Sequence, residues 1–136
     1  MARIMALDYG QKRTGIAVTD PLQIIASALT TVETKLLVPF LNRYFAQEEV
    51  GKVIIGYPLN LDGTPTHNTE RVEKFIERFT RIYPGLPIEK RDETYTSKMA
   101  MEVMIASGMK KAERRKKENI DKISAAILLQ EYLQHK

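Results

Sequence analysis

The sequence predicts a single α/β domain built on a mixed five-stranded sheet, with helices packed on both faces. Three short apolar strands near the N-terminus are joined by tight connections, which favour antiparallel pairing because a parallel crossover needs about a dozen residues or more. Strands and amphipathic helices then alternate, as is typical of βα units. A chain of 136 residues has the size of one domain with its own core, so residues 1–136 are expected to form one unit.

The first three strands are predicted from apolar and β-branched runs bounded by turns. Residues 4–7 are apolar and end at Asp8, as expected of a buried strand. Gly10 and the polar residues after it form a turn, and the β-branched run 14–19 is the second strand. The third strand is expected nearest residues 28–32.

Helices and two further strands alternate in the rest of the chain. Helical spacing of apolar residues or helix-terminal signals predict helices over residues 34–49, 69–82, 96–107 and 120–133. Strands are expected at residues 52–57 and 88–91, and a loop at 60–68. Pro39 lacks an N–H donor, so the first helix should become regular only near Val38. Gly108 is expected to stop the third helix.

The last predicted helix is expected to pack inward through one row of aliphatic residues. These residues are Ile120, Ile123, Ile127 and Leu128. Asp121 then falls in the first turn, where a carboxylate also interacts favourably with the helix dipole.

The composition excludes several classes of protein. The chain contains no cysteine, which rules out disulfides, thiolate zinc sites and a cysteine nucleophile. Residues 21–32, the longest uncharged stretch near the start, are too few and too polar to cross a bilayer. The N-terminal residues lack a signal-peptide pattern. We therefore expect a soluble cytoplasmic protein without a membrane partner.

Positive charge is concentrated in one segment. The formal net charge is +4, and residues 110–117 alone contain six bases and one acid. Such a run attracts polyanions, chiefly nucleic acid, through counterion release; a solvated loop or helix end is the alternative interpretation. The six bases are Lys110, Lys111, Arg114, Arg115, Lys116 and Lys117.

Three acids stand where elements of the predicted core end or begin. Asp8 closes the first strand, Glu93 follows the fifth, and Asp121 opens the last helix. Gathered at one edge of a sheet, they would repel one another unless protonated or neutralised by cations. Mg²⁺ and Mn²⁺ prefer such oxygen ligands, and a pair of these ions promotes in-line displacement at a phosphodiester. Each acid also has a purely structural interpretation. Asp8 would only terminate a strand, Glu93 would be an exposed loop acid, and Asp121 would be a favourable charge at a helix N-terminus.

Other catalytic arrangements have little support. The two histidines are His67, in the predicted loop, and His135, at the C-terminus, so a histidine metal site or a Ser-His-Asp triad is not expected. The sequence contains neither GxxxxGK[ST] nor GxGxxG, the phosphate-binding motifs of nucleotide enzymes.

Several segments together resemble one known family. Residues 8–20, DYGQKRTGIAVTD, are similar to the opening motif of YqgF proteins, also called RuvX. Residues 56–60 with Gly63 resemble their Gly-x-Pro loop, residues 92–97 their Asp-Glu-Arg segment, and residues 120–133 their C-terminal helix. The resemblance extends over nearly the whole chain, with the motifs in the same order.

This resemblance implies a ribonuclease H-like fold and a metal-dependent nuclease. Asp8, Glu93 and Asp121 match the family's acids, so they are expected to be catalytic and to ligate Mg²⁺ or Mn²⁺. The implied substrate is structured nucleic acid, with processing of the 5′ end of precursor 16S rRNA favoured. Resolution of Holliday junctions, a branched DNA, is the alternative.

Two features near the predicted acids bear on phosphate binding. Lys12 and Arg13 stand one turn from Asp8 and are expected to hold a scissile or flanking phosphate. The family's usual Arg after Asp-Glu is Thr94 in this chain, so any phosphate binding by that Arg is missing or is taken over by a neighbour such as Arg91.

Two other classes of function stay open. A non-catalytic RNA-binding or ribosome-assembly factor would need only the basic segment. The Asp-x-Gly motif at residues 8–10 also opens the phosphate loops of sugar kinases and actin, although such proteins need a second similar domain to close over ATP. The expected oligomeric state is a monomer or a homodimer, and a junction resolvase should act as a symmetric dimer.

Overall fold

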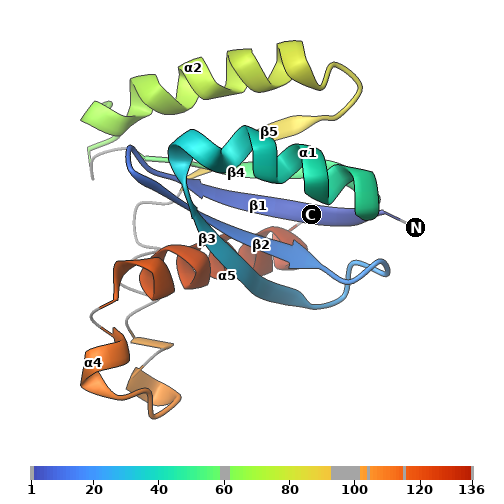
Figure 1. Ribbon diagram of the computed structural model, residues 1–136. Helices are drawn as coiled ribbons and strands as arrows, with labels where there is room; N and C mark the ends of the chain where they lie inside the picture. The colour runs from blue at the N-terminus through green and yellow to red at the C-terminus, as the bar shows by residue number, and fades with distance from the viewer. Residues whose placement is uncertain (1, 59–61, 93–101, 104, 115, 136) are drawn as a thin grey trace.

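The computed structural model describes residues 2–58, 62–92, 102–103, 105–114 and 116–135 (Figure 1). The strands in this part of the chain are β1 (Arg3–Tyr9), β2 (Arg13–Thr19), β3 (Ala26–Glu33), β4 (Val50–Tyr57) and β5 (Ile88–Asp92). The helical elements are the 3₁₀ helix η1 (Thr34–Leu36), α1 (Leu37–Gln47), α2 (His67–Ile82), α4 (Lys111–Arg114) and α5 (Lys117–His135). The strands form one sheet in the order β3-β2-β1-β4-β5.

The strands pair as the connection lengths predict. β1 is antiparallel to β2, and β2 is antiparallel to β3, because short turns join consecutive strands. β4 returns beside β1 in the parallel sense after α1, and β5 is parallel to β4 after α2. The expectation of a mixed five-stranded sheet is confirmed.

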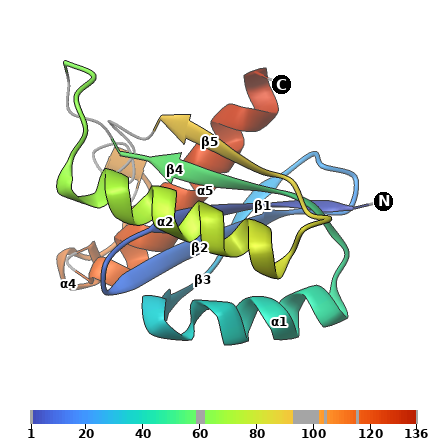
Figure 2. The same cartoon turned by 90° about the horizontal axis from the view of Figure 1, so that it is seen from above.

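Helices cover both faces of this sheet. α1 and α2 lie on one face and α5 on the other (Figures 1 and 2). Met5 and Leu7 of β1 pack in the core beneath α1 and α2, whereas Ile4 and Ala6 pack against Ala125 and its neighbours on α5. Side chains of a strand point alternately to the two faces, so β1 contributes to both cores.

The start and the buried face of α5 differ from the prediction. The helix begins at Lys117, so Asp121 lies in the second turn rather than the first. Ile120, Ile123 and Ile127 are only half-buried. The buried positions are Ser124, Ala125, Leu128, Leu129 and Tyr132. The prediction was right for Leu128 and wrong for the three isoleucines, because apolar residues occur on all sides of residues 120–133 and spacing alone does not select the face that packs inward.

The N-termini of the other two long helices follow from local chemistry. α1 becomes regular at Leu37, after η1, close to the predicted position. α2 begins two residues before the predicted start. Its first turn is closed by a capping box in which the Asn68 amide donates to Thr66 Oγ1 and the Thr66 amide donates to Thr69 Oγ1.

The third predicted helix lies largely outside the described residues. Within the described part, helical residues 105–106 are followed by Gly108 in the left-handed conformation, with φ at +80°, which fits the expected stop signal. Among the described helices, none has the length and apolar character needed to span a membrane.

Candidate functional site

Asp8 lies near the carboxyl end of β1, on the face of the sheet that α5 covers. Ile4 and Ala6 point toward α5, and strand alternation gives Asp8 the same direction. Its side chain is half-buried, and its cross-strand partner on β2 is Gly15. The acid therefore stands at the boundary between the core beneath α5 and the edge of the sheet.

At Gly15 the backbone of α5 touches the sheet directly. A β-carbon on Gly15 would collide with the backbone carbonyl of Asp121 and would lie 2.7 Å from the Lys122 nitrogen. Only glycine permits this approach of helix to strand. Thr31 of β3 secures the same turn, because its hydroxyl donates to the Glu118 carbonyl at 2.5 Å. Asp8 and the helix turn of Asp121 therefore lie on one face of the sheet, next to Gly15.

The Asp121 carboxylate is paired with Arg13 of β2. Arg13 Nε donates to Asp121 Oδ2 at 3.0 Å, and the two side chains are 35% and 21% exposed. Burial raises the pKa of Asp121 above its ordinary value, and the hydrogen bond and charge of Arg13 offset part of that rise. Glu118 adds to the increase by repulsion. The site therefore holds a partly desolvated carboxylate that a positive charge stabilises.

The third predicted acid, Glu93, lies outside the described residues, as does Thr94. In the sequence Glu93 directly follows Asp92, the last residue of β5. Because β1, β4 and β5 are parallel, the carboxyl ends of β1 and β5 face the same edge. Within the described ranges, no three or more His, Cys, Asp or Glu side chains are grouped to hold a metal ion. The three-acid metal set thus stays a prediction.

The predicted phosphate-binding bases fall on two sides of these carboxylates. Lys12 and Arg13 belong to the β1–β2 turn and the start of β2. The described bases of the basic segment, Lys110, Lys111, Lys116 and Lys117, are all exposed. α4 lies beyond the N-terminal end of α5 (Figure 1), so this segment adjoins the turn that carries Asp121. The Arg114 side chain and Arg115 lie outside the described part.

Arg91, the expected substitute for the family's arginine, is engaged on the α5 face. Its Nε donates to Glu89 Oε2 at 2.7 Å, and its guanidinium lies 4.8 Å from the Tyr132 ring centroid. Lys52 joins the same group, donating to Glu89 at 3.1 Å and to the Tyr132 hydroxyl at 2.9 Å. These contacts give Arg91 a structural role between β5 and α5, and its part in phosphate binding stays a prediction.

Two residues that sequence reasoning missed hold the β1–β2 turn in place. The Thr34 amide donates to the Lys12 carbonyl at 2.9 Å, and the Thr34 hydroxyl donates to the Gly10 carbonyl at 2.7 Å. From α2, Asn68 Nδ2 donates to the Tyr9 carbonyl at 2.7 Å. Both partners are distant in sequence, and neither belongs to a motif that would single it out.

Comparison with known proteins gives a match along almost the whole chain. A family model described as "RuvX: Holliday junction resolvase" matches residues 2–135. A Flavobacterium psychrophilum protein named "Putative pre-16S rRNA nuclease" is 52% identical over 136 residues, covering 100% of this chain and 99% of that protein. Proteins of the same name from Christiangramia forsetii and Bacteroides thetaiotaomicron are 50% and 46% identical, over 98% and 100% of this chain and 98% and 99% of their own lengths.

Proposed function

Because this chain belongs to the RuvX family, we propose that it is a nuclease acting on structured RNA in the processing of precursor 16S rRNA. The names of its relatives support this substrate. The structural observation that carries the proposal is the placement of Asp8 and Asp121 on one face of the sheet, next to Gly15. This reaction belongs in the bacterial cytoplasm, where ribosomes are assembled.

The proposed site would hold Mg²⁺ or Mn²⁺ through Asp8, Asp121 and Glu93. The described donors fit such ions, since both are carboxylates and the partly buried Asp121 is already stabilised by a cation, Arg13. When bound, the ions would supply activation of water and neutralisation of charge on the phosphate.

The chain's own residues prepare this site in three ways. Gly15 lets α5 approach closely enough to place Asp121 beside β2. Arg13 orients the Asp121 carboxylate through the hydrogen bond to Oδ2. Lys12 and the basic segment 110–117 supply positive charge for the flanking phosphates, which raises RNA affinity without reading sequence.

The test of catalysis is Asp8→Asn, which keeps the side-chain shape and removes the charge. We expect cleavage of precursor RNA in Mg²⁺ or Mn²⁺ to be lost, while the circular dichroism spectrum and most RNA binding are retained. Asp20→Asn is the matched control, because Asp20 lies just beyond the opposite end of β2 from Arg13, and it should cleave like the wild type. Wild-type cleavage by Asp8→Asn, prepared free of other nucleases, would refute the proposal.

The second candidate is resolution of branched DNA, which the family model's description favours. Matched RNA and four-way DNA substrates, each with and without Mn²⁺, separate the two activities. Cleavage of the junction with the RNA left intact, by a protein that sediments as a symmetric dimer, would replace the first proposal. If charge reversal at Lys116 and Lys117 abolished function while Asp8→Asn was harmless, a non-catalytic RNA-binding factor would replace both.

A further inference from the structure

A pocket beside the β1–β2 turn is lined mainly by basic side chains. Its volume is about 500 Å³, within the range of roughly 300–1,000 Å³ found for ligand pockets. The lining residues are Gln11, Lys12, Arg13, Glu33 and Lys35. Arg13 is paired with Asp121, so the excess positive charge comes from Lys12 and Lys35 against one lining carboxylate, Glu33, and it favours an anionic ligand.

The carboxylate in this pocket, Glu33, compensates little of the charge on Lys35. Glu33 Oε2 lies 3.6 Å from Lys35 Nζ, and the side chains are 60% and 79% exposed. An ion pair this long and this exposed contributes little, about 0–1 kcal/mol. Lys35 can therefore exchange Glu33 for a better anionic partner at low cost.

The backbone around the pocket is fixed before any ligand arrives. Thr34 joins its two sides, since its amide donates to the Lys12 carbonyl and its hydroxyl donates to the Gly10 carbonyl. The Thr34 hydroxyl is also 2.9 Å from the Thr14 hydroxyl on β2. Because the turn and the end of β3 are tied together in this way, binding orders only side chains and loses less entropy.

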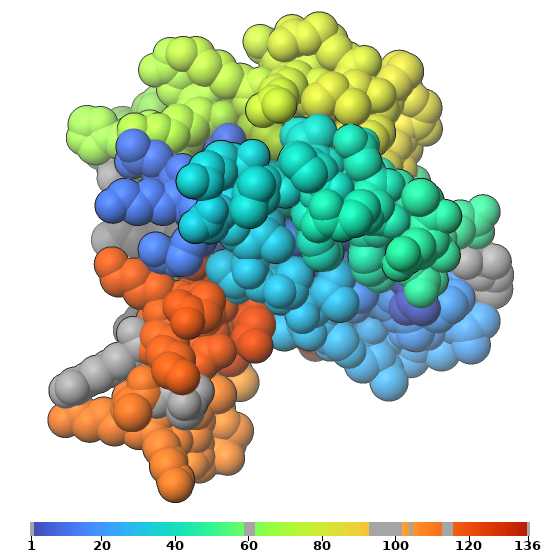
Figure 3. All heavy atoms as spheres, viewed as in Figure 1, coloured from blue at the N-terminus to red at the C-terminus, as the bar shows by residue number. Residues whose placement is uncertain are grey.

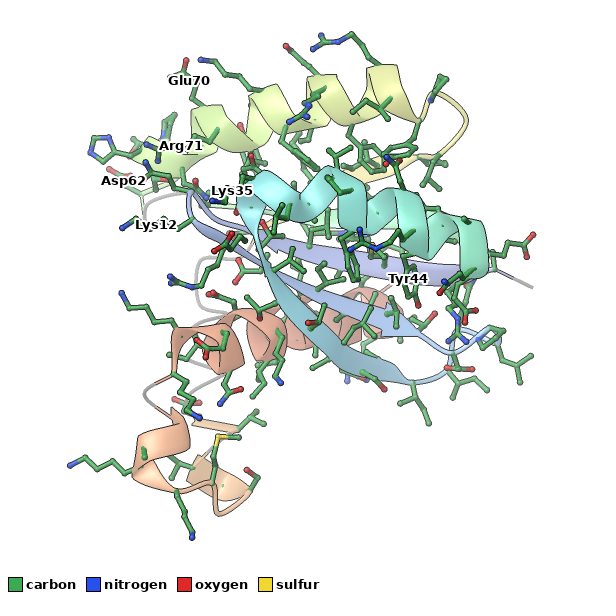
Figure 4. All side chains as sticks on the ribbon, viewed as in Figure 1. Lys12, Lys35, Tyr44, Asp62, Glu70 and Arg71 are labelled. Atoms are coloured by element: carbon green, nitrogen blue, oxygen red, sulfur yellow. The ribbon has the colours of Figure 1, made fainter. Side chains whose placement is uncertain are left out.

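The pocket is continuous with the carboxylate site through Arg13. This side chain lines the pocket and also donates from Nε to Asp121. A guanidinium has five N–H donors, so one bond to Asp121 leaves capacity for a second anion. Figure 4 shows Lys12 and Lys35 near the same end of the sheet. In Figure 3 the β1–β2 turn lies beside η1 and beside the N-terminal end of α5, and α4 lies farther along the same face.

We propose that this pocket binds a backbone phosphate of the substrate RNA, on the side of the carboxylates opposite the basic segment 110–117. The inference rests on the proposed function. A strand crossing the sheet edge would be held by Lys12 and Lys35 before it reaches Asp8 and Asp121, and by the basic segment after it. Contacts on both sides fix the position of the bond to be cut, and they select backbone shape rather than base sequence.

The test measures RNA affinity in EDTA, where binding is read without cleavage. In Lys12→Gln/Lys35→Gln, we expect weaker binding and a shallower salt dependence. The slope of log K against log [salt] should fall by about 0.7–0.9 for each phosphate that the variant no longer neutralises. The matched control is Lys74→Gln/Arg81→Gln, two exposed bases of α2 outside the pocket, which should keep the wild-type slope. Lys12→Arg/Lys35→Arg should retain most of the affinity.

A second measurement separates an RNA phosphate from a free anion. Amide NMR signals of Gln11 and Lys35 are followed during titration with inorganic phosphate and with a short RNA. We expect RNA to shift them at much lower concentrations, and the double Gln variant to lose the shift. Two results would overturn the inference. One is that Lys12→Gln/Lys35→Gln keeps the wild-type RNA affinity and salt slope; the other is that inorganic phosphate shifts the signals at the same concentrations as RNA. Failure of the proposed function would instead appear as intact binding with no cleavage by the wild type.

Discussion

Replacing Gly15 with alanine is the most informative single perturbation of this fold. The new methyl would point at the backbone of α5, where it would lie 2.7 Å from the Lys122 nitrogen and would collide with the Asp121 carbonyl. Relaxed contacts between carbon atoms need about 3.5–4.0 Å, so the helix would have to retreat by about 1 Å at Lys122 and by more at Asp121.

The structure indicates a large effect on stability. Overpacking costs about 1–3 kcal/mol when side chains adjust. Here the obstacle is helix backbone, which the Thr31 hydroxyl also holds in place through Glu118, so we expect the free energy of unfolding to fall by about 3 kcal/mol. Displacement of Asp121 by about 1 Å should in addition lower the rate of RNA cleavage by roughly 10²-fold.

Urea denaturation followed by circular dichroism measures the change in stability. Gly85→Ala is the control, because no described atom beyond its two chain neighbours lies within 4 Å of the added carbon, and its stability should stay within about 0.5 kcal/mol of the wild type. Wild-type stability of Gly15→Ala would show that α5 does not pack on β2 as closely as described, and the argument for Asp8 and Asp121 as neighbours would fail with it.

Three further predictions concern the supports of the fold. Amide hydrogen bonds to the Asp20 carboxylate, led by that from Ile25, lower the pKa of Asp20. The stability that these bonds contribute is fully present above the pKa of Asp20 in the unfolded chain, and it is lost as the pH falls through the lower pKa of the folded protein. The protection factor of the Ile25 amide against hydrogen exchange should therefore fall in acid, and in Asp20→Asn it should already be lower at neutral pH. Tyr132→Phe removes the oxygen that accepts from Lys52 and should cost about 1 kcal/mol in urea denaturation. Thr66→Ala removes the cap of α2 and should also cost about 1 kcal/mol in thermal unfolding; unchanged stability of either variant would contradict the corresponding hydrogen bond.

The arrangement of strands was predictable because it depends on local features. Gly10 and the short polar run after it allow only a tight turn, and such a turn forces β1 and β2 to pair antiparallel. The buried face of α5 was not predictable in this way. Spacing separates polar from apolar sides of a helix, and in α5 polar and apolar residues are interspersed around the helix, so spacing gives no such contrast.

The candidate site was predictable only in part. Asp8 and Asp121 were identified by their positions at the ends of elements, and the structure places both on the α5 face. Neither the pairing of Arg13 with Asp121 nor the contact of Gly15 with α5 has a local signal. Both join residues more than a hundred positions apart, and a single sequence does not report which distant element covers a given strand.

The two acids come from opposite ends of the chain, Asp8 from the first strand and Asp121 from the last helix. A polypeptide emerging from the ribosome folds from its N-terminus onward, so β1 and β2 are made long before the helix that completes the site. Until α5 docks on Gly15, a growing chain carries Asp8 without its counterpart. Under the proposed function, a nascent chain therefore cleaves no RNA until α5 has been synthesised and has packed on β2.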